Sequence, residues 1–125
     1  MEINLNKKMR TSLILKNMNL LFVDDNKHIS AEIYTLFSAI FKSIMLAHSV
    51  AKAKNIYQGK STDIIITDIK MPGQDGLSFV EDIRSTNASV PITILSAHTD
   101  KQYLLRAANL QIDGYITKPL NFKKL

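Results

Sequence analysis

The stretch Asp63-Ile-Ile-Ile-Thr-Asp68 decides the fold of this chain. Its three isoleucines form a continuous β-branched run, which is typical of a strand that is buried on both faces of a parallel sheet. The run ends in a carboxylate, and the breaker cluster Met71-Pro-Gly73 follows it. We therefore expect Asp68 to lie at the rim where the strand gives way to a loop, which is where α/β sheets carry their chemistry.

Four further short apolar runs lie on either side of this stretch, at residues 20–23, 44–47, 92–95 and 115–117. The segments between them carry apolar residues at three- and four-residue spacing, which predicts amphipathic helices, the first from about 27 to 41. The fourth of these helices is expected to turn Leu104, Ala107 and Ala108 inward. Alternating strands and helices predict an α/β fold with a five-stranded parallel sheet and helices on both faces.

In a doubly wound sheet with the flavodoxin-like strand order 2-1-3-4-5, the first and third strands are neighbours, and a crevice opens at their C-terminal ends. Asp24 and Asp25 follow the first strand, and Asp68 ends the third. Three neighbouring carboxylates repel one another, so they either take up protons or hold a cation. A hard divalent ion such as Mg²⁺ suits this all-oxygen set of ligands.

Two further polar residues end two of the other strands of this predicted sheet, Ser96 the fourth and Lys118 the fifth. A hydroxyl donor and an ammonium group beside carboxylates and a metal suit the binding of a phosphoryl group. A carboxylate can itself act as the nucleophile and form an aspartyl phosphate. Of the three carboxylates, Asp68 is the one expected to face both Lys118 and Ser96.

Composition limits the possible classes of protein. The 125 residues, of which 46% are hydrophobic, predict one domain with one core. No apolar run approaches the roughly 20 residues of a membrane span, and no signal peptide is recognisable, so we expect a cytoplasmic protein without membrane contact. Zero cysteines exclude disulfides and thiolate metal sites. The net charge of +5 lies mainly near the two ends of the chain, which is weak evidence for nucleic-acid binding.

The sequence resembles the receiver domain of bacterial two-component response regulators. The matching motifs span residues 18 to 120 in the order of that family, and they are Phe22-Val-Asp-Asp25, Ile66-Thr-Asp68, Met71-Pro-Gly-Gln-Asp-Gly-Leu77, Leu95-Ser-Ala97 and Tyr115-Ile-Thr-Lys-Pro119. The resemblance supports the strand order 2-1-3-4-5. It implies a receiver (phosphoacceptor) domain over residues 18–125, preceded by an N-terminal extension of residues 1–17.

The resemblance also implies a set of ligands for Mg²⁺. Asp68 would be the phosphoacceptor and one of these ligands. Asp25 would be a direct ligand and Asp24 a ligand through a water molecule, and the main-chain carbonyl of Lys70 would be another direct ligand.

By the same resemblance, Lys118 would contact the phosphoryl group. Ser96 and Tyr115 would form the switch pair, in which the hydroxyl moves toward the phosphoryl group while the ring turns inward. The added charge would then bias a surface around the fourth helix and the fifth strand of the domain, which would alter homodimerisation or partner affinity.

The implied function is a phosphorylation-dependent signalling switch. A histidine kinase or a histidine phosphotransfer protein would donate the phosphoryl group. The chain would not be an enzyme with an external substrate, because it would catalyse only its own phosphorylation and dephosphorylation. Nucleic acid would be contacted only through an output domain absent from this chain.

Some positions depart from the family pattern. Gln111 stands where many relatives have the Gly that ends the fourth helix of the domain, so either a non-Gly residue adopts a left-handed conformation there or the helix ends differently. Lys70 and His98 occupy variable positions beside the site. We hypothesise that their bulk and charge hinder hydrolytic water and lengthen the phosphorylated lifetime.

The fifth helix of the domain is expected to be truncated, because Asn121 is its predicted N-cap and the sequence stops at Leu125. We expect the chain to be part of a longer protein and an apolar groove to remain on one face of the sheet. The N-terminal segment around Met9, Leu13 and Ile14, or the same segment of a second chain, is expected to cover that groove.

Two alternatives stay open. One is a receiver-like interaction module that does not depend on phosphate. The other is a Mg²⁺-dependent phosphohydrolase with an Asp nucleophile on a related sheet. Such enzymes commonly carry a second Asp two residues beyond the nucleophile, where this chain has Lys70, so the phosphohydrolase is disfavoured.

Overall fold

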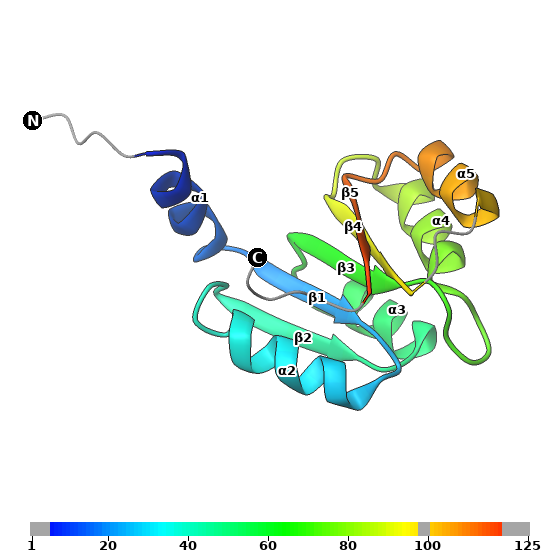
Figure 1. Cartoon of the computed structure of the whole chain (residues 1–125), viewed down its shortest axis with the longest axis horizontal. Coiled ribbons are helices and arrows are strands. Elements are labelled where there is room, and N and C mark those ends of the chain that lie inside the picture. The colour runs from blue at the N-terminus through cyan, green and yellow to red at the C-terminus, as the bar shows by residue number, and fades with distance from the viewer. Residues whose placement is uncertain (1–5, 98–100, 119–125) are drawn as a thin grey trace, which may run out of the picture.

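The computed structural model describes residues 6–97 and 101–118. The helices and strands follow one another as α1 (Lys7–Leu15), β1 (Asn19–Val23), α2 (Lys27–Phe37), β2 (Ser43–Ala47), α3 (Val50–Gly59), β3 (Ile64–Asp68), α4 (Gly76–Thr86), β4 (Ile92–Ser96), α5 (Lys101–Asn109) and β5 (Gly114–Thr117). The five strands form one sheet in the order β2-β1-β3-β4-β5, and every neighbouring pair is parallel (Figure 1). The predicted doubly wound, flavodoxin-like fold is therefore confirmed.

The sheet separates two apolar clusters, because successive residues of a strand point to opposite faces. Leu21 and Ile65 belong to the larger cluster, which includes the buried residues of α3, α4 and α5. Leu20 and Phe22 belong to the smaller cluster with Ile33 of α2. The central strands are covered on both faces, which is why they appear in the sequence as continuous apolar runs rather than as alternating ones.

α2 ends earlier than predicted. It begins after Asn26, whose side chain accepts a hydrogen bond from the Ile29 N–H, and it ends at Phe37 rather than near residue 41. The amides of Ile40 and Phe41 both donate to the Phe37 carbonyl, so the chain folds back over the end of the helix before it enters β2. Ile40 and Phe41 thus belong to a turn. They keep the apolar spacing of the helix, although the helix itself has ended.

α1 does not cover the sheet, and the prediction that this segment of the same chain fills a groove beside the final strand is wrong. Asn6 caps the helix, but none of its residues is buried, and Met9, Leu13 and Ile14 are 48%, 50% and 61% exposed. Figure 1 shows α1 far from β5. The reason is the short connection to β1, which places the helix beyond the N-terminal end of the strand. That the same segment of a second chain covers the groove stays a prediction.

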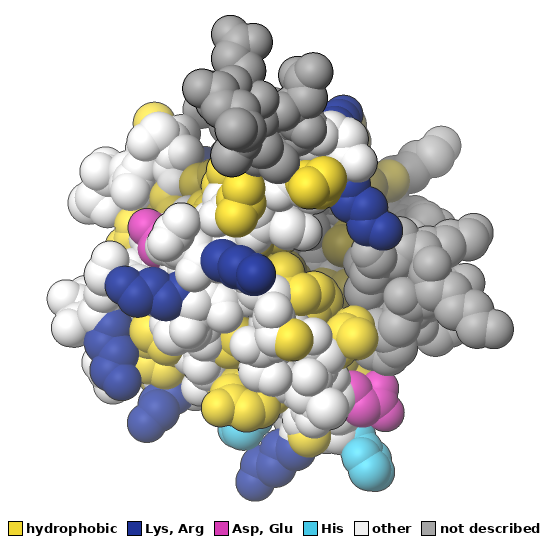
Figure 2. All heavy atoms as spheres, turned by 90° about the vertical axis from the view of Figure 1, so that its left-hand side faces the viewer, with side chains coloured by type: hydrophobic (Ala, Val, Ile, Leu, Met, Phe, Trp, Pro, Cys, Tyr) yellow, Lys and Arg dark blue, Asp and Glu magenta, His cyan; other side chains and the backbone are white. Residues whose placement is uncertain are grey.

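Lysine and arginine side chains are frequent on the side of the molecule where β1 and β2 begin (Figure 2). Hydrophobic side chains lie between them, and acidic side chains are few in this view.

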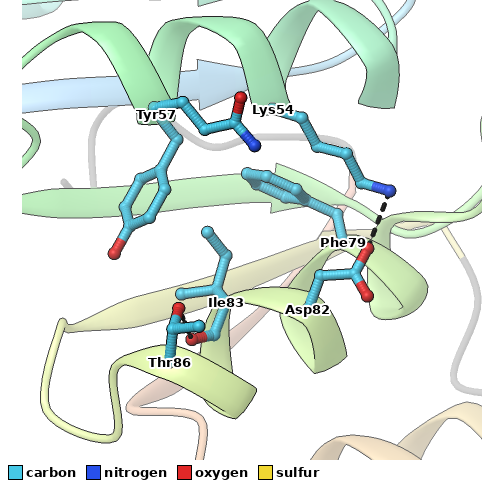
Figure 3. Close-up of a pocket in the computed structure, with 7 residues that line it drawn as sticks. Lys54, Tyr57, Phe79, Asp82, Ile83 and Thr86 are labelled. Atoms are coloured by element: carbon cyan, nitrogen blue, oxygen red, sulfur yellow. Dashed lines mark hydrogen bonds and ion pairs between the residues drawn. The ribbon is translucent and has the colours of Figure 1, made fainter.

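α3 and α4 lie side by side on one face of the sheet. Lys54 of α3 and Asp82 of α4 form an ion pair at 2.7 Å, and Phe79 and Ile83 form the apolar floor of a pocket of about 370 Å³ below it (Figure 3). Tyr57 closes one side of this pocket and accepts a hydrogen bond from Asn87, so the two helices are joined at both ends of the pocket.

α5 is rotated relative to the prediction. Ala107 is buried, but Leu104 is 38% exposed and Ala108 is exposed. Half-buried Tyr103 packs against the larger cluster instead, because a ring four residues before Ala107 lies on the same face of the helix. No helix in the part of the chain that the structure describes is both long and apolar enough to cross a membrane.

Gln111 follows the end of α5, at the position where many relatives have Gly. Gln111 adopts the left-handed conformation, with φ of 56°, so the first of the two expected outcomes is confirmed. The predicted N-cap Asn121 and the truncated fifth helix lie outside the described residues, as does His98. Those expectations stay predictions.

Candidate functional site

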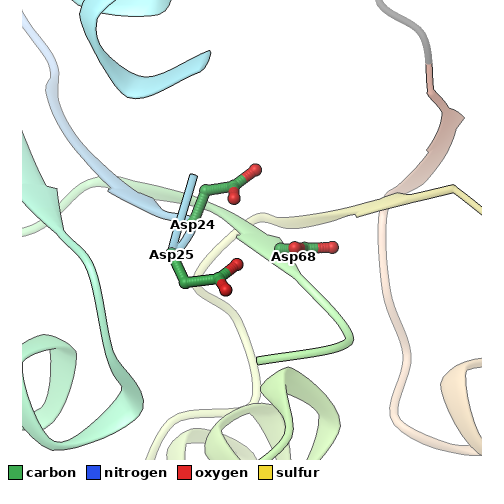
Figure 4. A group of neighbouring side chains, drawn as sticks. All are labelled: Asp24, Asp25 and Asp68. Atoms are coloured by element: carbon green, nitrogen blue, oxygen red, sulfur yellow. The ribbon is translucent and has the colours of Figure 1, made fainter. Parts of the chain in front are cut away.

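The predicted acidic residues meet at the C-terminal edge of the sheet. Asp24 and Asp25 follow β1, Asp68 ends β3, and these two strands pair with each other. Each of the three residues has a carboxylate oxygen within 4.8 Å of one from the other two. Figure 4 shows the three side chains at the adjoining strand ends, with their carboxylates extending in the same direction.

Asp24 is fully buried and its two oxygens have different partners. Oδ1 accepts a hydrogen bond of 2.9 Å from the Asn26 N–H, which fixes the side chain against the start of α2. Oδ2 lies 2.9 Å from Lys118 Nζ but receives no well-directed hydrogen bond from any described residue. We regard this contact as a charge–charge interaction, and its orientation leaves the oxygen able to accept a further ligand.

Lys118 reaches the acidic residues from the far side of the sheet. Its backbone N–H donates to the Ser96 carbonyl at 2.7 Å, which continues the pairing of β5 with β4. Its ammonium group contacts Asp24 and also Asp68 Oδ2, at 3.2 Å. Burial lowers the pKa of Lys118, but the close contact with Asp24 and the charges of both carboxylates outweigh it, so the pKa lies above its ordinary value and the amine stays protonated.

Asp68 is nearly buried, with 6% of its surface exposed. Burial and the neighbouring charge of Asp24 raise its pKa, whereas Lys118 and the hydrogen bond from the Ile69 N–H to Oδ1 oppose the shift. The net direction is upward from the ordinary value. The ionised carboxylate therefore needs positive charge beside it, which is the role that a lysine and a bound cation can share.

Two residues that sequence reasoning gave no role hold the backbone of Asp68. The hydroxyl of Thr67 donates to the Asp68 carbonyl at 3.0 Å. Gly76, the first residue of α4, lies so close that a Cβ atom there would stand 1.8 Å from the same carbonyl oxygen. The glycine was visible in the loop motif of residues 71–77, but its need follows only from this close approach of two backbone segments.

Ser96 and Tyr115 are placed differently. Ser96 is buried at the end of β4, beside the strand that ends in Asp68, so it shares the edge with the acidic residues. Tyr115 pairs with Ile94 within the sheet and is half-buried against the larger apolar cluster.

Lys70 does not turn its side chain toward the acidic residues. The ammonium group lies 5.7 Å from the centre of the Tyr103 ring on α5, which is a cation–π distance. The side chain is exposed.

The donor set determines which ion this site suits. Its three side-chain ligands are carboxylates, and neither His28 nor His48 belongs to the group. Hard oxygen donors favour Mg²⁺ over softer metals. The closely spaced carboxylates and the incompletely satisfied Oδ2 of Asp24 fit such an ion.

Comparison with known proteins agrees with this geometry. The family described as "Response regulator receiver domain" matches residues 20–125. Among curated relatives, the transcriptional regulatory protein RprY of Bacteroides fragilis is 34% identical over 99 residues, which are 79% of this chain and 36% of RprY. The sensor protein GacS of Pseudomonas syringae is 32% identical over 84% of this chain and 12% of GacS. The chain thus spans only a fraction of the length of these relatives.

Solved structures give the same result. The chemotaxis response regulator CheY4 of Vibrio cholerae is 28% identical and superposes with a TM-score of 0.75, covering 84% of this chain and 89% of CheY4. A CheY-like receiver domain protein from Methanospirillum hungatei, at 18% identity and a TM-score of 0.81 over 86% of each chain, shares the fold.

Proposed function

Because the chain belongs to the response regulator receiver domain family, we propose that Asp68 accepts a phosphoryl group and that the chain thereby acts as a switch in two-component signalling. The receiver domain would occupy residues 18–125 and the N-terminal extension residues 1–17. The observation that carries the proposal is the ammonium group of Lys118 within 3.2 Å of Asp68 and 2.9 Å of Asp24 at one edge of the sheet.

The proposed reaction is a transfer from phosphohistidine. A histidine kinase or a histidine phosphotransfer protein presents the phosphoryl group, a carboxylate oxygen of Asp68 attacks the phosphorus, and the phosphorus–nitrogen bond breaks as the imidazole leaves. The Ile69 N–H holds the other carboxylate oxygen, which orients the nucleophile. Lys118 stabilises the negative charge on the phosphoryl oxygens, as a cation does in phosphoryl transfer generally.

We assign the binding of Mg²⁺ to Asp24, Asp25 and Asp68, with the main-chain carbonyl of Lys70 as a further ligand. When bound, Mg²⁺ offsets the charge that develops on the phosphoryl oxygens. Asp24 would act through a water molecule because it is fully buried and already bonded to the Asn26 N–H, whereas Asp25 is exposed and can bind directly.

The response to phosphorylation would pass through Ser96 and Tyr115. Ser96 lies on the same edge as Asp68, and Tyr115 lies two residues before Thr117, the partner of Ser96 in the sheet. A movement of the Ser96 hydroxyl toward the phosphoryl group would free space for the Tyr115 ring. The surface of α5 and β5 would then change its affinity for a partner or for a second copy of the chain. Lys70 and His98 would lengthen the phosphorylated lifetime.

The wider setting is also a proposal. We place the protein in the cytoplasm and expect its chemistry to be limited to its own phosphorylation and dephosphorylation. Any contact with nucleic acid would require an output domain beyond the residues of this chain.

The test is labelling with a small acyl phosphate such as acetyl phosphate. The wild-type chain should become labelled only with Mg²⁺ present, and Asp68→Asn should abolish the label, while Asp113→Asn should keep it. Equal labelling of Asp68→Asn would refute the assignment. A folded chain that binds neither Mg²⁺ nor beryllofluoride would instead favour the phosphate-independent interaction module.

A further inference from the structure

The outer edge of β2 is a candidate interaction surface on a different part of the molecule from the acidic site. β2 stands at one end of the sheet and pairs only with β1 among the described strands. An edge strand presents backbone N–H and C=O groups that another extended segment can pair with. The five residues of β2 are Ser-Ile-Met-Leu-Ala, so the strand itself carries no charge, no proline and no glycine to oppose such pairing.

A groove runs along this edge between β2 and α3. Its volume is about 480 Å³, and it is lined by Ile44, Met45 and Leu46 of β2, by Lys52 and Ile56 of α3, and by Lys60, which follows α3. The three residues of β2 are only partly buried; Met45 lies on the face that α3 covers, and Ile44 and Leu46 lie on the opposite face. An added strand would therefore find both backbone groups to pair with and apolar positions for its side chains.

The charge around the groove selects the partner. Residues 33–62 contain no Asp or Glu, but they contain Lys42, Lys52, Lys54 and Lys60. Lys54 is neutralised by Asp82 of α4. The other three lysines are exposed and form no ion pair with any residue that the structure describes. The β2–α3 edge thus combines an apolar groove with positively charged side chains around it.

These observations disfavour a second copy of the chain as the occupant. Edge-to-edge pairing of β2 with the β2 of a second copy would bring the lysines of both copies together, and like charges across an interface oppose association. An anionic partner is favoured instead. The unpaired backbone and the apolar groove suit a polypeptide better than a nucleic acid, whose phosphates would use the lysines alone.

We propose that the β2–α3 edge binds an extended acidic peptide segment of a partner protein, which adds to the sheet as a sixth strand beside β2. Alternate apolar side chains of the segment enter the groove, and its Asp or Glu side chains lie against Lys42, Lys52 and Lys60. This surface acts independently of phosphorylation at Asp68.

The probe is a seven-residue peptide of alternating Glu and Val, blocked at both ends, titrated into the ¹⁵N-labelled full chain. Chemical-shift changes should concentrate in β2 and α3, and added salt should weaken binding. The double variant Lys52→Glu/Lys60→Glu should weaken it about ten-fold or more. Lys8→Glu/Lys16→Glu, in α1 and at its C-cap, has the same change in net charge and should bind as the wild type does.

Several results would overturn the proposal. They are the absence of binding at millimolar peptide, equal binding of a peptide of alternating Lys and Val, shift changes located away from β2 and α3, and displacement of the peptide by a single-stranded oligonucleotide of comparable charge. A dimer of the free chain that Lys52→Glu/Lys60→Glu leaves intact but Met45→Lys dissociates would assign the edge to a second copy instead.

Discussion

Lys118 lies closer to Asp24 than to Asp68, at 2.9 Å against 3.2 Å. The lysine predicted to serve the phosphoryl group therefore also balances the charge of a fully buried carboxylate. A residue in this position supports the folded state as well as the chemistry, and the two roles can be separated by experiment.

Lys118→Met should lower the free energy of unfolding by up to about 3 kcal/mol, because it leaves a buried carboxylate without its counter-charge. Urea denaturation in metal-free buffer measures this loss. The double variant Asp24→Asn/Lys118→Met should recover much of the stability, since the neutral amide needs no ammonium partner. Equal stability of the single and double variants would mean that the ion pair contributes little.

Asp68→Asn should raise the melting temperature at pH 7 in metal-free buffer. The folded state raises the pKa of Asp68 above 3.8, so the stability linked to its protonated form is complete below that value and is lost as the pH rises through the folded pKa. The advantage of the variant should therefore shrink as the pH falls from 7 toward 4, and Mg²⁺ should reduce it at pH 7. Circular dichroism melts provide the measurement, with exposed Glu32→Gln as the control.

Gly76→Ala should destabilise the chain and prevent labelling of Asp68, because the new methyl group would collide with the Asp68 carbonyl. Gly59→Ala is the matched control. Nothing lies within 4 Å of a Cβ atom at Gly59, so the same substitution in α3 should be neutral or stabilising by about 0.5–1 kcal/mol. A Gly76→Ala variant as stable as Gly59→Ala would show that α4 can shift away at little cost.

Arg84→Met should destabilise the chain by at least about 2 kcal/mol, because loss of the guanidinium leaves partly buried carbonyls without donors. The Arg84 side chain, only 9% exposed, donates to the carbonyls of Leu110, Gln111 and Val90 at 2.7–2.9 Å. Arg106→Met is the comparison, since Arg106 forms exposed ion pairs with Asp75 and Glu81 that should contribute no more than about 1 kcal/mol. Chemical denaturation of both variants distinguishes the two arginines.

Gln111→Gly should stabilise the chain by about 1 kcal/mol, because a left-handed conformation strains a side chain that has a Cβ atom. The Arg84 contact is made to the Gln111 backbone carbonyl, so it survives this substitution. A loss of stability on changing to Gly would show that the glutamine side chain makes a favourable contact of its own.

The sequence was sufficient for the fold and for the position of the acidic residues. Continuous apolar runs such as Leu20–Val23 and the carboxylates that follow them are local signals, and parallel pairing carries those carboxylates to a common edge. The face of α5 was not predictable in this way. Leu104 and Ala108 follow the same spacing as Ala107, and only the position of the helix on the sheet decides that Tyr103 faces inward.

The role of Gly76 and the burial of Asp24 depend on distances between segments far apart in the chain. The local sequence of two adjacent Asp residues does not show which one is enclosed, yet Asp24 is buried and Asp25 is exposed. Likewise, no pattern in the sequence distinguishes Arg84 from Arg106, although one is enclosed and the other lies at the surface.

β5, which carries the residues before Lys118, is one of the two edge strands of the sheet and pairs only with β4 among the described strands. Fraying of this short strand would withdraw the lysine from the acidic residues, so local opening is opposed by electrostatic attraction as well as by backbone hydrogen bonds. Amide hydrogen exchange in residues 114–117 would then report on the charges of the acidic residues, which belong to other strands than β5.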